Sequence, residues 1–174
     1  MKVKSICCIG AGYVGGPTMS VIAQKNPNIK VTVVDLNAQR ISDWNNDDLS
    51  RLPIYEPGLS ELVIKNYKNK KLKFSTDLKT SIKSSDIIFI CVGTPTSKNG
   101  STADLSQVFS VTKEISKSIN KFKIIITKST VPVTTGDEIE KILLKKIKKN
   151  KFSVVSNPEF LREGEAIRDF IYPD

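Results

Sequence analysis

The sequence has no histidine, and among its 174 residues it has only three cysteines, two methionines and one tryptophan. Without histidine, these residues can supply neither an imidazole general base nor an imidazole metal ligand. Cys7, Cys8 and Cys91 lie in apolar runs, and the adjacent Cys7 and Cys8 would point to opposite faces of a strand. We therefore expect reduced, buried thiols and no metal site, which favours a cytoplasmic protein.

Long apolar runs are also missing, since none approaches the roughly 20 residues that a membrane-spanning helix needs. The chain enters a strand-like segment at once, without the charged and apolar regions of a signal peptide. Apolar residues make up 39% of the chain, which is too many for a disordered protein. The sequence thus predicts one folded domain over residues 1–174 with no membrane partner.

Arginine is scarce, with four of the 27 basic residues, so the net charge of +9 comes almost entirely from lysine. The densest lysine run, residues 145–151, falls at the expected end of a helix, where the helix dipole favours positive charge. Such a run could bind nucleic acid, but it holds no aromatic residue and no arginine, the usual reader of bases. A solvated helix end is the simpler interpretation, and we expect no nucleic-acid partner.

Short β-branched runs alternate with longer amphipathic segments along the chain. We expect strands at residues 3–9, 30–35, 72–75, 86–92, 123–127 and 152–155. We expect helices at residues 13–25, 37–44 and 58–66, a brief helix capped by Asp77, and helices at 104–119 and 135–149, the last opened by a capping box from Thr135 to Glu138. Continuous apolar strands separated by helices indicate an α/β fold, a Rossmann-like doubly wound parallel sheet with helices on both faces.

A glycine-rich motif, G-x-G-x-x-G, follows the first expected strand. It comprises Gly10, Ala11, Gly12, Tyr13, Val14 and Gly15. The first glycine permits a tight turn, the second lets the backbone approach a pyrophosphate, and the third lets the helix pack closely on the strand. The following helix would offer its free N–H groups to the phosphates. The motif therefore predicts a dinucleotide-binding loop.

The second expected strand ends at Asp35, 20 residues after Gly15. An acid at this place accepts hydrogen bonds from the ribose hydroxyls of a bound adenosine. Its carboxylate would also repel the 2′-phosphate of NADP. Arg40 could in principle offset that repulsion, but an arginine here more often lies beside the adenine or the ribose. We therefore predict NAD as the cofactor.

Four further polar segments stand between the expected elements. They are Tyr55-Glu-Pro-Gly-Leu59, Val92-Gly-Thr-Pro-Thr96, Lys128-Ser-Thr-Val-Pro132 and Asn157-Pro-Glu-Phe-Leu-Arg-Glu-Gly164. Together with residues 10–18, these segments closely resemble the UDP-glucose 6-dehydrogenase family, within the UDP-glucose/GDP-mannose dehydrogenases. The last three segments follow strands, so they would line the carboxyl edge of the sheet, where open α/β sheets bind ligands.

The resemblance implies an NAD-dependent oxidoreductase that converts UDP-glucose to UDP-glucuronate in two successive oxidations through a cysteine thioester. It assigns a catalytic water to Thr130 and acid–base work to Glu159, since a carboxylate beside a sugar and a water can exchange protons at each step. It assigns cofactor binding to the glycine-rich loop, Asp35, Arg40, Val92, Gly93, Thr94, Pro95, Thr96, Ser129, Val131 and Glu163. It assigns the sugar to Glu159, Phe160, Leu161, Arg162 and Glu163.

The sequence also departs from the family pattern. Gly93 stands where some members have asparagine, and the loop after Thr96 is shorter than in some members. The family's catalytic cysteine, lysine and asparagine, its connecting helix, its UDP-binding domain and its homo-oligomer contacts belong to a region beyond residue 174. We therefore expect a truncated and inactive NAD-binding half that is poorly ordered after Glu163.

Other functions are open at this point. GDP-mannose or UDP-N-acetylmannosamine dehydrogenase is the nearest alternative, because the missing half holds most of the substrate site. A non-catalytic NAD-sensing module would use the same fold. A nucleic-acid-binding protein would depend on the charge of +9 alone, and it would have to show salt-dependent retention on DNA.

Overall fold

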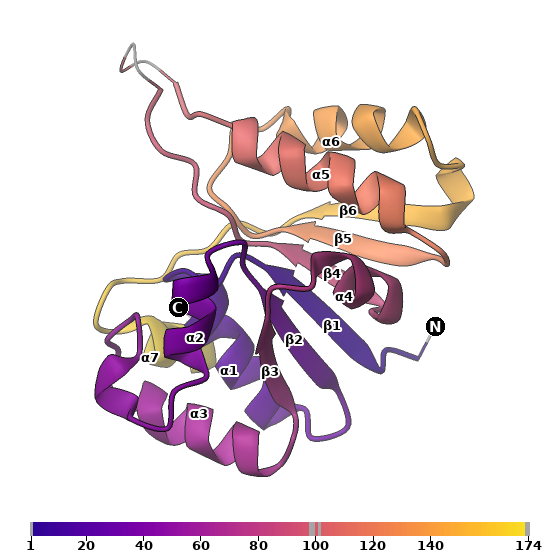
Figure 1. Ribbon diagram of the computed structural model, residues 1–174. Helices are drawn as coiled ribbons and strands as arrows, with labels where there is room; N and C mark the ends of the chain where they lie inside the picture. Colours follow the sequence, from indigo (N-terminus) through magenta and orange to yellow (C-terminus); the bar gives the residue numbers. More distant parts are fainter. Residues whose placement is uncertain (1, 98–99, 101, 173–174) are drawn as a thin grey trace.

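The computed structural model describes residues 2–97, 100 and 102–172, which include a six-stranded parallel sheet. The strands are β1 (Ser5–Ile9), β2 (Lys30–Val34), β3 (Leu72–Ser75), β4 (Ile87–Ile90), β5 (Lys123–Thr127) and β6 (Phe152–Ser156). Their order across the sheet is β3-β2-β1-β4-β5-β6 (Figure 1). The order reverses between β1 and β4, so the carboxyl ends of these two strands form the switch point at which such sheets bind ligands.

Helices cover both faces of the sheet (Figure 1). One face carries α1 (Gly15–Lys25), α2 (Ala38–Trp44), α3 (Leu59–Lys68) and α7 (Ala166–Ile171), and the other carries α4 (Leu78–Ser84), α5 (Ser106–Ser118) and α6 (Thr135–Leu144). Two 3₁₀ turns, η1 (Leu49–Arg51) and η2 (Lys149–Lys151), complete the described elements. In the part of the chain that the structure describes, no helix is long and apolar enough to cross a membrane.

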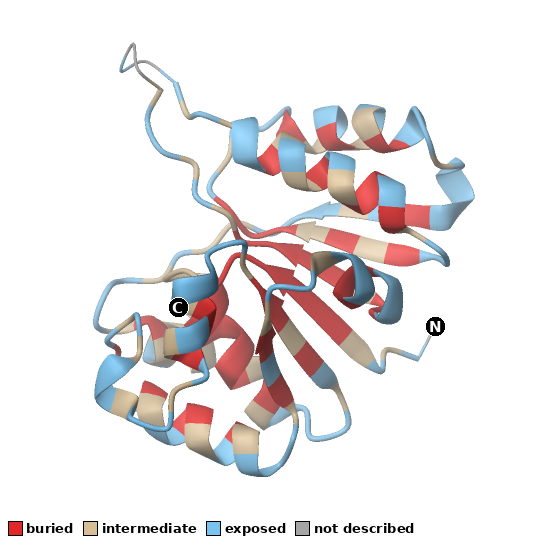
Figure 2. Ribbon diagram, in the orientation of Figure 1, coloured by how far each residue is buried: buried red, intermediate tan, exposed pale blue. Residues whose placement is uncertain are grey.

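The sheet separates two apolar clusters, visible as the buried layers in Figure 2. In β1, Cys8 belongs to the cluster under α1, α2 and α3, whereas its neighbour Cys7 belongs to the cluster under α4, α5 and α6. Because both faces are covered, the strands need apolar side chains on both sides, which explains their continuous apolar runs. Cys7, Cys8 and Cys91 are buried and unpaired, as expected.

The expected strands and helices are present, with ends that differ by a few residues. β3 and β5 have the predicted bounds, and the cap at Asp77 is confirmed, since its carboxylate accepts the Thr80 N–H at 3.0 Å. The predicted first residue of α6, Thr135, is confirmed, but the predicted capping box and the predicted end at residue 149 are wrong. Thr134 is the N-cap and Thr135 is buried as the first helical residue, so no capping box forms. The helix also ends at Leu144, so the lysine run at residues 145–151 forms a turn and η2 rather than a helix end.

The expectation of poor order after Glu163 is also wrong. Ala166–Ile171 form α7, which packs against α1. Ala166 is buried, and Ile167 packs on the same apolar cluster as α1. A helix this short is marginal in water, so this packing is what orders the segment.

Asp86 joins the amino ends of β1 and β4. Its Oδ2 accepts the backbone N–H groups of Lys4 and Ser5 at 2.9 and 3.1 Å, and its Oδ1 is bonded to the Lys121 ammonium. Burial alone raises the pKa of Asp86, but the Lys121 contact and the backbone donors outweigh it and lower the pKa to about 2. Asp86 therefore stabilises the fold as an anion.

Candidate cofactor site

The glycine-rich loop connects β1 to α1 at the switch point of the sheet. Gly10 has a φ of +110°, which other residues rarely adopt, and its N–H donates to the Val34 carbonyl at 2.8 Å. A methyl group on Gly15 would overlap the Gly10 carbonyl oxygen and lie 3.0 Å from Cys8 Sγ, whereas a methyl group on Gly12 would meet no atom within 4 Å. The fold itself thus requires Gly10 and Gly15, and Gly12 leaves open space for a ligand.

The amino end of α1 faces this loop and, among the described residues, has no side-chain cap. The first turn of the helix has no acidic residue either. Free N–H groups and the partial positive charge of a helix N-terminus attract anions. The loop and the helix end together therefore suit a pyrophosphate.

Trp44 braces the loop from the neighbouring helix α2. Its Nε1–H donates to the Ala11 carbonyl at 2.9 Å, and its ring stacks on Phe74 with centroids 4.4 Å apart. Gly16 leaves room for this ring, because any side chain there would overlap it. No sequence motif indicated this role for Trp44, which is the only tryptophan of the chain and a natural fluorescent reporter of the loop.

Asp35 lies at the end of β2, and its carboxylate accepts three hydrogen bonds. Oδ2 accepts from the Ala11 N–H at 2.9 Å and from Arg40 Nη1 at 3.0 Å, and Oδ1 accepts from the Asn37 N–H at 2.9 Å. Burial raises the pKa of Asp35, but these donors outweigh it and hold the pKa below its ordinary value. Asp35 thus stays ionised beside the glycine-rich loop, which suits ribose hydroxyls and opposes an additional phosphate.

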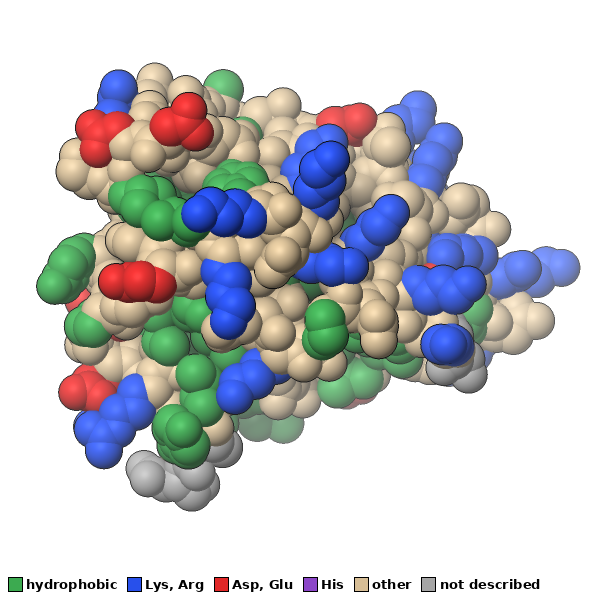
Figure 3. Space-filling model, turned by 90° about the horizontal axis from the view of Figure 1, so that it is seen from below, with side chains coloured by type: hydrophobic (Ala, Val, Ile, Leu, Met, Phe, Trp, Pro, Cys, Tyr) green, Lys and Arg blue, Asp and Glu red, His purple; other side chains and the backbone are tan. Residues whose placement is uncertain are grey.

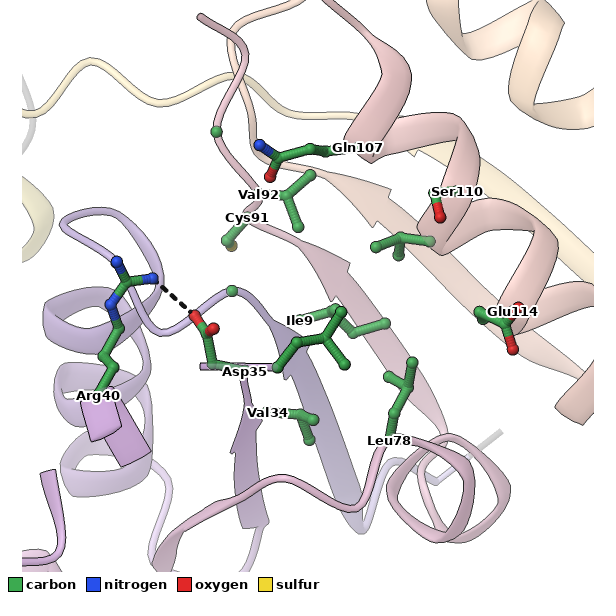
Figure 4. Close-up of a pocket in the computed structure, with 15 residues that line it drawn as sticks. Ile9, Val34, Asp35, Arg40, Leu78, Cys91, Val92, Gln107, Ser110 and Glu114 are labelled. Carbon is green, nitrogen blue, oxygen red and sulfur yellow. Dashed lines mark hydrogen bonds and ion pairs between the residues drawn. The ribbon is translucent and has the colours of Figure 1, made fainter. Parts of the chain in front are cut away.

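A cavity of about 570 Å³ opens between the glycine-rich loop, the end of β2 and α5 (Figure 4). Of the predicted cofactor residues, its lining includes Gly10, Gly12, Asp35, Arg40, Val92 and Gly93. The others lie outside the lining: Ala11, Tyr13, Val14, Gly15, Thr94, Pro95, Thr96, Ser129, Val131 and Glu163. The cavity suits an adenosine with its ribose and phosphates. Its apolar walls match the adenine, the Asp35–Arg40 pair matches the ribose, and the open space at Gly12 matches the phosphates.

Several residues that line this cavity were not predicted from the sequence. They are Ile9, Val34, Leu36, Leu78, Cys91, Gln107, Ser110, Val111 and Glu114. Four of these come from α5, and Figure 4 shows Gln107, Ser110 and Glu114 on the helix beside the cavity. Their spacing of three and four residues is that of one helix face, so helical periodicity could have marked them as a group. Leu36, directly after Asp35, also lines the cavity and is 84% exposed.

The loops that follow β4 and β5 are bonded to each other. Ser129 Oγ donates to the Val92 carbonyl at 2.6 Å, and Thr94 Oγ1 donates to the Thr130 carbonyl at 2.9 Å. Val131 packs on the apolar cluster under α5 and α6. In this arrangement the Ser129 and Thr94 hydroxyls support the main chain around Val92 at the edge of the cavity.

The two predicted catalytic side chains are in contact. Thr130 Oγ1 donates to Glu159 Oε1 at 3.3 Å, and Glu159 Oε2 accepts the Leu161 N–H at 2.8 Å. Thr130 follows β5 and Glu159 follows its neighbour β6, so two parallel strands bring them to the same edge of the sheet. A hydroxyl and a carboxylate in contact can hold a water molecule and exchange its proton.

The other residues around Glu159 have separate roles in the structure. Lys128 is buried, which lowers its pKa, and its ammonium donates to Asn157 Oδ1 at 3.3 Å and to the Pro158 carbonyl at 3.4 Å, so it fixes the turn before Glu159. Phe160 is 86% exposed. Farther along, the Arg162 guanidinium donates to both carboxylate oxygens of Asp169, at 3.0 and 2.6 Å. Hydrogen bonds made by Glu159 and Arg162 thus hold the loop that carries the predicted substrate residues.

The family model described as "UDP-glucose/GDP-mannose dehydrogenase family, NAD binding domain" matches residues 4–174. The chain is 51% identical over 173 residues to UDP-glucose 6-dehydrogenase 4 of Arabidopsis thaliana and 48% identical over 178 residues to UDP-glucose 6-dehydrogenase of Pongo abelii. These matches cover 97% and 99% of this chain but only 35% of each relative. The chain therefore spans about a third of the length of these relatives.

Solved structures agree with the sequence matches. A UDP-glucose dehydrogenase from the archaeon Pyrobaculum islandicum superposes on this chain with a TM-score of 0.89 at 32% identity. The match covers 99% of this chain and 40% of the archaeal chain. A GDP-mannose dehydrogenase from Pseudomonas aeruginosa has a TM-score of 0.85 at 35% identity. That match covers 97% of this chain and 39% of the Pseudomonas chain. Because sequence and fold agree over nearly every residue, the chain belongs to the UDP-glucose/GDP-mannose dehydrogenase family and forms its NAD-binding domain.

Proposed function

We propose that the protein carrying this chain oxidises UDP-glucose to UDP-glucuronate with NAD, and that this chain supplies the NAD-binding half. The observation that carries the proposal is the contact between Thr130 and Glu159 at the same sheet edge as the cofactor cavity. The reaction oxidises an alcohol twice and then hydrolyses a thioester to release the product. The oxidations need a hydride acceptor, and the hydrolysis needs a group that transfers protons. The identity of about half to UDP-glucose 6-dehydrogenases supports the choice of sugar nucleotide.

Each part of the site has a role in this reaction. The cofactor-binding residues would hold NAD, which would supply the hydride acceptor for each of the two oxidations. Asp35 orients the adenosine ribose, Arg40 keeps Asp35 in place, and Gly12 admits the pyrophosphate. Residues 92–96, with Ser129, Val131 and Glu163, border the nicotinamide half.

The catalytic pair acts on water rather than on the cofactor. Thr130 orients the water that hydrolyses a thioester, and Glu159 takes a proton from that water. The thiol of the thioester comes from outside this sequence, in a second domain that also binds UDP. Residues 159–163 border the sugar.

GDP-mannose and UDP-N-acetylmannosamine are the second candidates, because the Pseudomonas relative acts on GDP-mannose and is 35% identical. A non-catalytic NAD-sensing module is the alternative without chemistry. Basic side chains are dispersed over the face shown in Figure 3 instead of being gathered in one groove, which favours a dinucleotide over a nucleic acid. We place the protein in the cytoplasm, where unpaired thiols stay reduced, and its homo-oligomer contacts outside this chain.

The experiment compares the three sugar nucleotides with the whole protein, with NAD or NADP, by following the absorbance of the reduced cofactor. We expect UDP-glucose with NAD to react fastest and to yield two NADH per sugar. In parallel, the 174-residue chain should bind NAD, followed by Trp44 fluorescence, and should form no NADH. Faster turnover of GDP-mannose, no turnover of any sugar nucleotide, or equal affinity for NADP and NAD would each overturn the corresponding part of the proposal.

A further inference from the structure

Glu56, in the Tyr55–Leu59 segment, has no role in the site described so far. It lies in the loop between η1 and α3, and it is only 4% exposed. Among the described side chains, no lysine or arginine forms an ion pair with it. A buried carboxylate without a cation must be stabilised by other donors.

Those donors are backbone N–H groups of the segment that follows the candidate substrate residues. Glu56 Oε1 accepts the Gly164 N–H at 2.8 Å, and Oε2 accepts the Ala166 N–H at 3.1 Å. The Tyr13 hydroxyl oxygen accepts the same Gly164 N–H at 2.9 Å. Three segments meet at this point: the Glu56 loop, the glycine-rich loop and the chain after Glu159.

The backbone is shaped for this contact on both sides. Residues 56–59 form a tight turn in which the Leu59 N–H donates to the Glu56 carbonyl at 3.1 Å. Pro57 is its second residue, and Gly58, its third, has φ +81° and ψ −1°, as a type II turn requires. Gly164 also has a positive φ, of +83°.

We propose that Glu56 is a positioning residue that holds residues 159–164 against the glycine-rich loop, so that the proton-transfer pair and the cofactor share one site. This inference depends on the proposed function. The start of the segment is held by the contact between Thr130 and Glu159, and its middle by Arg162 and Asp169. Without Glu56, the Tyr13 hydroxyl is the acceptor that remains for the Gly164 N–H among the described residues, and α7 still packs on α1.

The chemistry of the contact requires a carboxylate. Both partners are N–H donors, so the side chain must present two acceptor oxygens. A glutamine has nearly the same shape but offers one oxygen, and its NH₂ group would face a buried N–H. Glu56→Gln therefore breaks one hydrogen bond and brings two donors, the glutamine NH₂ and a backbone N–H, face to face. The side-chain volume hardly changes.

The test uses the whole protein as wild type, as Glu56→Gln and as Glu61→Gln. Glu61 is an exposed residue in the first turn of α3, so it controls for the loss of a carboxylate. The rate of amide hydrogen exchange at residues 160–166 measures how firmly this segment is held in place. Titrations with NAD and with ADP distinguish the two halves of the cofactor site. Relative to wild type, we expect Glu56→Gln to exchange about tenfold faster there, and to bind NAD and turn over about three- to tenfold less well. Binding of ADP, which reaches only the Asp35 side and the pyrophosphate loop, should not change.

Unchanged exchange, or faster exchange with wild-type NAD affinity and turnover, overturns the inference. An equal loss of NAD and ADP binding also overturns it, because it indicates general damage to the domain. Should Glu56→Gln not fold, Glu56→Asp keeps both oxygens but shortens their reach to the Gly164 and Ala166 N–H groups, and it must show the same pattern at smaller size. If the wild type binds no NAD, the proposed function fails, whereas the exchange measurement still decides whether Glu56 holds the segment.

Discussion

Replacing Gly15 with alanine separates the structural role of the glycine-rich loop from its role in binding. The new methyl group would overlap the Gly10 carbonyl oxygen and stand 3.1 Å from the Gly10 carbonyl carbon and 3.0 Å from Cys8 Sγ. Cys8 is fully buried, and the Gly10 main chain is tied to the Val34 carbonyl. Neither neighbour can move aside as a flexible side chain would.

The size of the effect follows from this overlap. Adding a methylene group to a packed core costs about 1–3 kcal/mol. Because the overlap is with main chain, we expect the upper end, which lowers the melting temperature of a chain of this size by roughly 6–12 °C. NAD affinity should fall as well, since relief of the overlap displaces the loop.

Gly12→Ala is the matched control within the same motif. A methyl group at Gly12 meets no atom within 4 Å, so the melting temperature should stay at or slightly above that of the wild type. NAD affinity should drop by about tenfold or more, because the methyl group keeps the backbone N–H groups from a phosphate oxygen. Thermal unfolding and calorimetric titration with NAD measure both quantities. A Gly15→Ala variant as stable as the wild type, or a Gly12→Ala variant that loses stability but binds NAD normally, would refute this reasoning.

Two further predictions concern catalysis and acid stability. Glu159→Gln in the whole enzyme should lower steady-state turnover by about 10²- to 10⁴-fold while an initial burst of NADH persists and mass spectrometry finds the sugar nucleotide trapped on the protein. Thr130→Ala should show a smaller loss, because it orients water without taking a proton; a Glu159→Gln burst slowed as much as turnover, without an adduct, contradicts the assignment. Asp86→Asn should lower the free energy of unfolding at neutral pH by about 2 kcal/mol. Because the pKa of Asp86 in the fold, about 2, is below its unfolded value, this difference should be full above about pH 4 and vanish toward pH 2 in urea unfolding; a constant difference contradicts it.

Local chemistry determined much of the fold in advance. The β-branched runs mark buried parallel strands because both faces of this sheet are covered, and β3 and β5 have the bounds that the runs indicate. The cap at Asp77 was predictable because it involves a side chain and an N–H three residues away. The cap of α6 was not, because Thr134 and Thr135 are each followed three residues later by an acid, and burial of Thr135 decides between them.

The meeting place of the candidate site residues was predictable for a similar reason. Residues that follow parallel strands must meet at one sheet edge, so the nearness of Thr130 and Glu159 follows from their places in the sequence. The cavity wall from α5 does not follow in this way, since its side chains sit far along the chain from the glycine-rich loop and reach it only through the packing of the helix.

The sequence by itself thus determined the order of the strands and helices along the chain, the glycine-rich loop and the sheet edge at which the polar loops meet. Only the tertiary structure decided that α7 packs on α1 and that Glu56 bonds to Gly164, 108 residues away. The physical reason is that a periodic pattern states which face of an element is buried, but not against which distant partner. That choice depends on how whole helices and loops fit together, and here it places a buried carboxylate between the cofactor loop and the segment that carries Glu159.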